Sequence, residues 1–232
     1  MGDSTRVVPI TDVVSRLERM RRERAGRHIA PIQASHPHRD AIEWWEGHCP
    51  SMFAGAALRH AAPGPGVDPV AYEQVCDLIS QWVAEPGGNL VISGPVGSGK
   101  TWLGAAACRG LAEIHGAYCA FESVARFFDA CRPGGTGIDK YLHRPVLMLD
   151  DVGSGRAELT TFEEERLFCL VNERWMNERV SVFTTNLTPQ GPESPLAIHL
   201  GERIFDRICH KALLVVVNGK SRRTEEWEGR AL

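Results

Sequence analysis

Short apolar runs alternate with amphipathic segments from about residue 67 to residue 217. Runs that are apolar on both faces are typical of parallel strands covered by helices on both sides of a sheet. Alternation of strands with helices predicts an α/β fold, a three-layer sandwich around a parallel five-stranded sheet. The five strands are predicted at residues 89–93, 117–121, 145–149, 180–185 and 213–217.

Helical periodicity occupies the segments between these strands. The first helix is capped by Asp68, and Pro69 suits its first turn because proline needs no amide partner there. Thr161 and Glu164 form a possible capping box for a long helix that ends near residue 178. The remaining helices are predicted at residues 102–114, 123–131 and 196–209.

Residues 1–66 follow a different pattern. Residues 11–24 are predicted to form a short amphipathic helix, and residues 61–66, rich in proline and glycine, form a predicted linker. A helix this short is marginal in water, so its apolar stripe must pack on its own domain or dock on another protein. We therefore divide the chain into a small, mostly helical N-terminal segment, 1–66, and a nucleotide-binding domain, 67–232. The stripe consists of Val13, Val14, Leu17 and Met20.

Composition indicates a soluble protein without a large basic surface. The 232 residues are 43% hydrophobic and carry a net charge of −3, so any contact with nucleic acid must come from a local patch or from an assembly. The seven cysteines are odd in number and scattered, which does not predict a disulfide framework. With no apolar run of membrane-spanning length, a cytoplasmic location is expected.

A complete phosphate-binding motif, G-x-x-x-x-G-K-[ST], lies between a predicted strand and a predicted helix. Its glycines let successive backbone N–H groups point at phosphate oxygens, and the helix N-terminus adds a positive end. Lys100 is expected to bind the β- and γ-phosphates of ATP, and the Thr101 hydroxyl to ligate Mg²⁺. The motif consists of Gly94, Pro95, Val96, Gly97, Ser98, Gly99, Lys100 and Thr101.

Carboxylates and an amide follow two other predicted strands. Asp150 and Asp151 come directly after the third strand, at the sheet edge where ligands bind in open α/β folds. Asp150 is expected to hold Mg²⁺, directly or through water, and Asp151 to orient the attacking water. Asn186 ends the fourth strand and could reach the γ-phosphate, or it could be a turn residue.

Arginines near the end of the chain are candidates for stabilising charge in the transition state of phosphoryl transfer. Arg203 and Arg207 are four residues apart and lie on one face of a predicted helix. They could instead form a solvated or salt-bridged face. Arg222 and Arg223 are further candidates.

The order of these motifs resembles that of the AAA+ ATPases of the DnaC/DnaI helicase-loader and IstB-like group. The resemblance covers about residues 68–226 and implies a P-loop AAA+ fold of the ASCE class, without the C-terminal helical lid of many AAA+ proteins. The motifs that carry it are the P-loop, Leu149-Asp150-Asp151-Val152-Gly153, Phe183-Thr184-Thr185-Asn186-Leu187, Gly201-Glu202-Arg203-Ile204-Phe205-Asp206-Arg207-Ile208 and Asn218-Gly219-Lys220-Ser221-Arg222-Arg223.

The same resemblance implies roles for individual residues. Asn186 matches the sensor-1 position, Arg207 the arginine finger that acts in a neighbouring subunit, and Arg223 the sensor-2 arginine. Arg222 stands where an aromatic residue is more usual, so the sensor-2 role could belong to either arginine. Asp151 stands where some members have Glu, and the shorter side chain suggests slow hydrolysis.

The resemblance also implies partners and an activity. We expect an ATP-hydrolysing, Mg²⁺-dependent homo-oligomer that loads a replicative DNA helicase onto single-stranded DNA, with residues 1–66 binding the helicase. An IstB-like transposition ATPase acting with a transposase is the main alternative, and a small-molecule P-loop kinase is a more distant one. A kinase does not explain Asn186, Arg207 and Arg223 in that order.

Two further groups of residues allow more than one interpretation. The basic segment 126–144 could follow the phosphates of single-stranded DNA or could be a solvated loop. The spacing of His36, His38, His48 and Cys49 is not standard for structural zinc, although these residues could bind a metal ion. The basic side chains of the segment are Arg126, Arg132, Lys140, His143 and Arg144.

Overall fold

The computed structural model describes residues 37–155 and 158–221. Its five strands form one sheet in the order β2-β3-β4-β1-β5, and all four pairings are parallel. The predicted α/β fold with a five-stranded parallel sheet is therefore confirmed. The strands are β1 (Leu90–Ser93), β2 (Cys119–Ser123), β3 (Val146–Asp150), β4 (Val180–Thr185) and β5 (Leu213–Val216).

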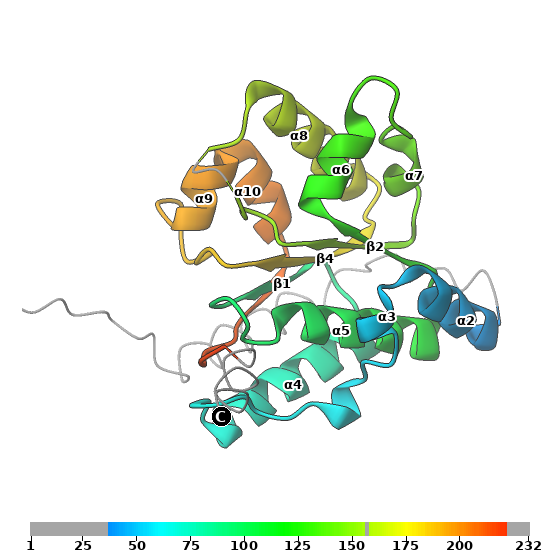
Figure 1. Cartoon of the computed structure of the whole chain (residues 1–232), viewed down its shortest axis with the longest axis vertical. Helices are drawn as coiled ribbons and strands as arrows, with labels where there is room; N and C mark the ends of the chain where they lie inside the picture. Colours follow the sequence, from blue (N-terminus) through cyan, green and yellow to red (C-terminus); the bar gives the residue numbers. More distant parts are fainter. Residues whose placement is uncertain (1–36, 156–157, 222–232) are drawn as a thin grey trace, which may run out of the picture. The chain divides into compact units, whose positions relative to one another are not determined.

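Helices cover both faces of this sheet, as Figure 1 shows. One face carries α4 (Pro69–Ala84) and α5 (Lys100–His115), with α2 (His38–His48), α3 (Ser51–Ala54) and the 3-10 turn η1 (Leu58–His60) packed beside them. The other face carries α6 (Val124–Cys131), α7 (Asp139–Leu142), α8 (Thr161–Met176), α9 (Pro195–Leu200) and α10 (Glu202–Cys209). None of the described helices has the length and apolar character needed to cross a membrane.

Three local details differ from the sequence prediction. Strand β2 begins two residues later than predicted, because Gly116 ends α5 in a left-handed conformation and the chain must still turn before it joins the sheet. The capping box of α8 is formed by Thr160 and Glu163, one residue before the predicted pair. The helix predicted at 196–209 is two helices, since Gly201 has a φ of 75° and breaks the hydrogen-bond ladder.

The sheet positions the functional residues through close packing on both faces. Helix α5 approaches the sheet at Gly104, where an added Cβ would lie 2.7 Å from Cε of Met148 and 3.3 Å from Cγ2 of Thr184. On the other face, Leu147, Leu149 and Phe183 belong to an apolar core shared with the helices α6, α8 and α10. The N-terminal half of α5 is thus packed closely against β3 and β4.

The described part of the N-terminal segment packs on this nucleotide-binding core. Trp45 of α2 is fully buried, and α2 and α3 both contact α5. Arg109 of α5 pairs with Glu46 at 2.7 Å and donates to the carbonyl of Ala54 at 2.9 Å. Residues 37–60 are therefore attached to the core. The helix predicted at 11–24 lies outside the described residues, and a partner-binding role for the segment stays a prediction.

Candidate nucleotide-binding site

The loop between β1 and α5 has the backbone shape that phosphate binding requires. Gly97 and Gly99 adopt φ values of 77° and 95°, a region that glycine enters at little cost. The N–H of Gly94 donates to the carbonyl of Thr185 at 3.2 Å, which ties the start of the loop to the end of β4. The loop leads directly into α5, so its N–H groups and the helix N-terminus can both serve an anion.

Lys100 is the first residue of α5 and is only 5% exposed. Its ammonium group donates to the carbonyl of Pro95 at 2.7 Å and therefore lies across the loop. When a nucleotide enters the loop, the ammonium group can exchange this carbonyl for the β- and γ-phosphates.

Asp150 ends β3 beside the start of α5. The pKa of its carboxyl group is raised above the usual value, mainly by burial. Hydrogen bonds from Thr184 and Thr101 and the nearby charge of Lys100 oppose this effect. A carboxylate and a hydroxyl beside a phosphate-binding loop are the oxygen ligands that Mg²⁺ prefers. The donor set of Thr101 and Asp150 thus fits a magnesium ion, and their role as its ligands stays a prediction.

Asp151 has an unusual backbone conformation. Its φ of 59° is left-handed, which costs about 1–2 kcal/mol for a residue other than glycine. Two hydrogen bonds hold it there: its N–H donates to Oγ1 of Thr184 at 3.0 Å, and its carbonyl accepts from the Ser154 hydroxyl at 2.7 Å. Strained residues of this kind occur at functional sites where the surrounding structure fixes them.

Asn186 is exposed directly after β4. Because β4 lies between β3 and β1, Asn186 lies between the strand that ends at Asp150 and the strand that enters the P-loop. The amide is thus at the sheet edge where the predicted sensor-1 role would place it.

Arg207 lies at the amino ends of the strands, whereas the P-loop lies at their carboxyl ends. Its carbonyl and that of Ile208 accept hydrogen bonds from Nδ2 of Asn89, the residue that precedes β1. The four residues of β1, about 13 Å of strand, separate the amino ends from the phosphate-binding loop. Arg207 is therefore badly placed to serve the nucleotide of its own chain.

The side chain of Arg207 is held against α8. Its Nε donates to Oδ1 of Asn172 at 2.7 Å, and its guanidinium carbon lies 5.1 Å and 5.4 Å from the ring centres of Phe168 and Trp175. Arg203, which is exposed, stacks on Phe168 at 4.1 Å. The two arginines thus share one face of the molecule.

The described chain ends beside the P-loop. A Cβ added to Gly97 would lie 2.1 Å from Oγ of Ser221, so the segment after β5 returns to the phosphate-binding loop. Arg222 and Arg223 follow immediately in sequence but lie outside the described residues. Their predicted sensor-2 role stays a prediction.

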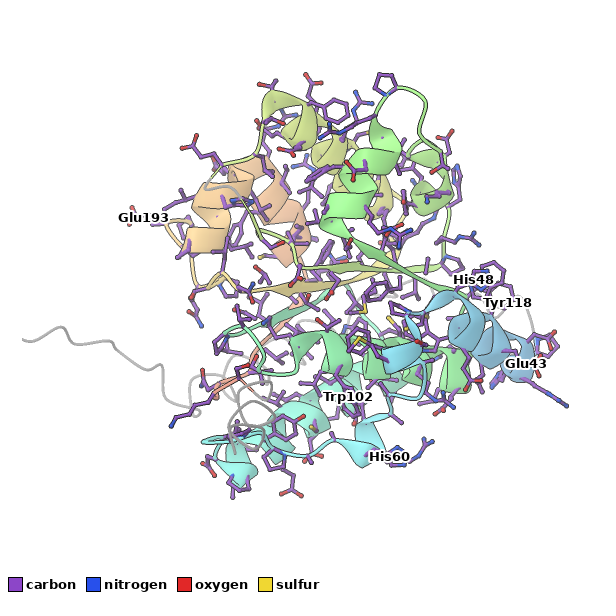
Figure 2. The ribbon with its side chains drawn as sticks, in the orientation of Figure 1. Glu43, His48, His60, Trp102, Tyr118 and Glu193 are labelled. Atoms are coloured by element: carbon purple, nitrogen blue, oxygen red, sulfur yellow. The ribbon has the colours of Figure 1, made fainter. Side chains whose placement is uncertain are left out.

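The possible metal ligands His38, His48 and Cys49 of the N-terminal segment do not form a cluster in the described part of the chain. Among the described residues, no group of three or more His, Cys, Asp or Glu side chains could hold a metal ion. His38 bonds the carbonyl of Glu113, whereas His48 bonds that of Trp44 and stacks on its ring at 3.6 Å. Cys49 is buried, and His36 lies outside the described residues. The bond of His38 ties α2 to α5, and Figure 2 shows His48 beside Tyr118, which also stacks on Trp44.

The basic segment 126–144 is largely paired within the chain. Arg126 and Lys140 lie 3.6 Å and 3.8 Å from Glu122, and Arg132 lies 3.5 Å from Asp129. Arg144 stacks on Trp44 at 5.0 Å. Exposed pairs of this kind are weak and can exchange for phosphates, so a DNA contact here stays a prediction.

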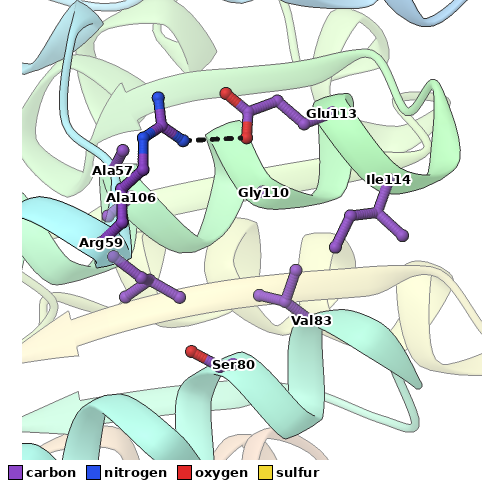
Figure 3. A pocket seen from close by; sticks show the side chains of 9 residues that line it. Ala57, Arg59, Ser80, Val83, Ala106, Gly110, Glu113 and Ile114 are labelled. Atoms are coloured by element: carbon purple, nitrogen blue, oxygen red, sulfur yellow. Dashed lines mark ion pairs between the residues drawn. The ribbon is translucent and has the colours of Figure 1, made fainter.

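A separate hollow lies between α4 and α5 (Figure 3). Its volume is about 170 Å³, and Ala106 and Gly110 belong to the part of α5 beyond its first turn. Arg59 of η1 and Glu113 of α5 form an ion pair of 3.5 Å beside it. The hollow is distinct from the P-loop and contains none of the predicted site residues.

Two residues with central positions were not predicted from the sequence. Thr184 bonds both Asp150 and Asp151, and Arg174 is buried in contact with the carbonyls of Tyr141 and Arg144, each at 2.9 Å. The double threonine before Asn186 was a visible signal for the first residue. An arginine in an amphipathic helix gives no such signal, because its burial depends on tertiary contacts.

Comparison with known proteins agrees with this geometry. The family model described as "IstB-like ATP binding protein" matches residues 67–228. The crystal structure of the DnaC helicase loader is 26% identical, with a TM-score of 0.62, over 72% of this chain and 99% of that chain. The crystal structure of DnaI is 25% identical, with a TM-score of 0.60, over 75% and 94% of the two chains. A search of curated proteins gave no match.

The family match covers more than half of the chain and includes every predicted site residue. Proteins of this family are P-loop ATPases, which accounts for the glycine-rich loop and the acidic end of β3. The chain therefore belongs to the DnaC/IstB-like family of AAA+ ATP-binding proteins.

Proposed function

We propose that this protein is an ATP-dependent loader that assembles on a replicative DNA helicase and single-stranded DNA, and hydrolyses ATP to drive loading and release. The observation that supports loading best is the likeness to the DnaC helicase loader, which extends over 99% of that chain. The family model supports an alternative, an IstB-like ATPase that acts with a transposase. Both functions use the same nucleotide site.

The residues at the carboxyl edge of the sheet divide the work of ATP hydrolysis. Lys100 and the N–H groups of residues 96–101 bind the phosphates, and Thr101 with Asp150 would hold Mg²⁺, which supplies positive charge to the β- and γ-phosphates. Asp151 orients the attacking water, and Asn186 contacts the γ-phosphate or that water. Because Asp151 has a shorter side chain than the Glu of some family members, we expect slow hydrolysis.

The position of Arg207 supports an oligomer. Since this arginine lies one strand length from its own P-loop, it can complete a nucleotide site only on another copy of the chain. A head-to-tail contact, in which one copy's α10 meets the next copy's P-loop, would supply the positive charge that phosphoryl transfer requires. To do so, Arg207 must exchange Asn172 for phosphate oxygens.

Partner recruitment is assigned to the part of the N-terminal segment that precedes α2. Residues 37–60 pack on α5 and serve the fold, so a deletion that tests recruitment should stop before His38. Deleting residues 1–36 leaves every described contact in place. We expect ATP binding to survive this deletion and helicase binding to be lost.

Size-exclusion chromatography with the replicative helicase of the same organism tests this proposal. The full-length protein with ATP should co-elute with the helicase, and the chain lacking residues 1–36 should not. Leu17→Asp should weaken co-elution, because a charge would enter an apolar contact, whereas Arg39→Ala, an exposed change in α2, should not.

Parallel chromatography with a transposase separates the two functions. Co-elution with the transposase alone would favour the IstB-like alternative. Co-elution of the truncated chain with the helicase at full-length affinity would move the helicase contact to the ATPase domain.

A further inference from the structure

Thr184 occupies a buried position between the two carboxylates that the proposed reaction requires. It lies in β4, and its side chain is completely excluded from solvent. The register of β3 and β4 pairs Met148 with Val182 and Leu149 with Phe183, so Thr184 is level with Asp150 on the face covered by α5.

The hydroxyl group of Thr184 makes two hydrogen bonds in opposite senses. It donates to Oδ1 of Asp150 at 2.5 Å, and it accepts from the backbone N–H of Asp151 at 3.0 Å. The backbone provides a third link, because the N–H of Val152 donates to the carbonyl of Thr184 at 2.8 Å. One hydroxyl therefore fixes both the side chain of the first carboxylate and the main chain of the second.

The rest of the side chain is fixed as well. The methyl group of Thr184 lies near Gly104, where an added Cβ would be only 3.3 Å from it. Because helix α5 leaves no room on that side, the hydroxyl cannot rotate away from the carboxylates without opening the packing. Thr184 is thus a rigid support rather than a mobile one.

We propose that Thr184 is a positioning residue for magnesium-dependent nucleotide binding. It holds Asp150 so that the carboxylate faces the Thr101 hydroxyl, and it holds Asp151 in the left-handed conformation that follows β3. The inference rests on the proposed ATPase chemistry and adds a residue to it. Outer-shell partners of metal ligands typically change metal affinity by about 10- to 100-fold when they are removed.

The experiment compares the affinity for a fluorescent ATP analogue, mant-ATP, in excess MgCl₂ with its affinity in EDTA. The dissociation constant in EDTA divided by that in MgCl₂ measures how strongly magnesium assists binding. Thr184→Val keeps the shape of the side chain but removes the hydroxyl, and should lower this ratio by about tenfold or more. Thr184→Ser keeps the hydroxyl and should stay within about threefold of the wild type.

Ser181→Ala is the matched control on the same strand. Ser181 also has a buried hydroxyl, but it accepts from Nε of Arg174 at the other end of β4. This variant can lose stability, yet its magnesium ratio should equal that of the wild type. If Thr184→Val does not fold, Thr184→Cys, which keeps a weak donor and a similar size, takes its place with an expected loss between those of Val and Ser.

The outcomes separate the two proposals. A folded Thr184→Val with the wild-type magnesium ratio overturns the positioning role while leaving the ATPase intact. A wild-type protein that does not bind mant-ATP with magnesium overturns the ATPase proposal itself. A loss of the ratio in Ser181→Ala equal to that in Thr184→Val would show a general effect of strand stability and would also overturn the inference.

Discussion

Charged side chains at the carboxyl edge of the sheet are buried, and their burial is explained by the partners that surround them. Lys100 and Asp150 are 5% and 7% exposed, and each is hydrogen-bonded to the loop or to a neighbouring strand. A buried charge is costly unless it is paired, so residues of this kind are retained where a ligand makes use of them.

Lys100→Ala should remove ATP turnover without unfolding the protein. The ammonium group donates to the carbonyl of Pro95 in the phosphate-binding loop, outside the apolar core, so its loss should leave the fold intact. Loss of one preorganised charge from the phosphates should lower turnover by about 100-fold or more. Phosphate release, with circular dichroism as the check on folding, measures this effect. Lys140→Ala, at a partly exposed lysine paired with Glu122, is the control and should keep full turnover.

Cysteine reactivity should follow burial. Burial raises the pKa of the Cys49 thiol from 9.0 to about 12, whereas Cys169 is exposed. At pH 8 the native protein should therefore react with iodoacetamide at Cys169 and leave Cys49 unmodified, because the thiolate is the reactive form. Since native Cys49 keeps its proton at a pH where the unfolded thiol has lost it, the free energy of unfolding should fall as the pH rises above about 9. Mass spectrometry of peptides after timed labelling tests the first expectation, and rapid native labelling of Cys49 would contradict it.

At the scale of single residues, the sequence predicts those functional roles that follow from a local motif. The P-loop and the acidic pair after β3 are of that type, since their position in a strand or at a helix start already places them at one edge of the sheet. The bond from Thr184 to Asp150 could not be predicted in this way, because it depends on the register between two strands that are 34 residues apart.

The elements of the chain are joined by a few contacts between helices that are distant in sequence. Helix α2 is the main example: Trp45 is fully buried, and Arg109 connects α5 to both Glu46 and the end of α3. Periodicity predicted the strands and long helices, whereas the attachment of α2 was missed because a composition boundary at residues 61–66 does not reveal tertiary contacts.

Trp45→Ala should destabilise the nucleotide-binding domain, although the residue precedes the predicted linker. Removal of a fully buried tryptophan side chain should lower the free energy of unfolding by about 3–5 kcal/mol. Trp175→Ala, at a site 42% exposed, should change it by about 1 kcal/mol or less. Urea denaturation followed by circular dichroism measures both changes. Equal effects of the two substitutions would mean that α2 does not contribute to the core.

For the whole molecule, the strand order decides which residues can act together. Alternation of strands and helices predicted five parallel strands but not their order, which is set by packing between segments far apart in the chain. The order β2-β3-β4-β1-β5 places Asn186 between Asp150 and the P-loop, whereas the contact with Asn89 places Arg207 at the amino ends of the strands. The first three groups can therefore share one nucleotide, whereas the role proposed for the arginine is on a neighbouring copy.

A mixing experiment with two inactive variants tests this arrangement. Arg207→Ala keeps an intact nucleotide site but cannot serve its neighbour, whereas Asp151→Asn keeps the arginine but has a defective site. If subunits mix randomly in a head-to-tail oligomer, about one quarter of the contacts in an equal mixture combine an intact site with an intact arginine. Turnover of the mixture should therefore recover to about one quarter of the wild-type value, while each variant alone stays inactive.

The double variant, Arg207→Ala with Asp151→Asn, is the control and should not recover when it is mixed with Arg207→Ala, because neither chain then carries the arginine. Analytical ultracentrifugation confirms that the chains associate under the assay conditions. A mixture no more active than its components, or full turnover by an Arg207→Ala monomer, would mean that the charge needed for hydrolysis comes from elsewhere in the chain or from the partner.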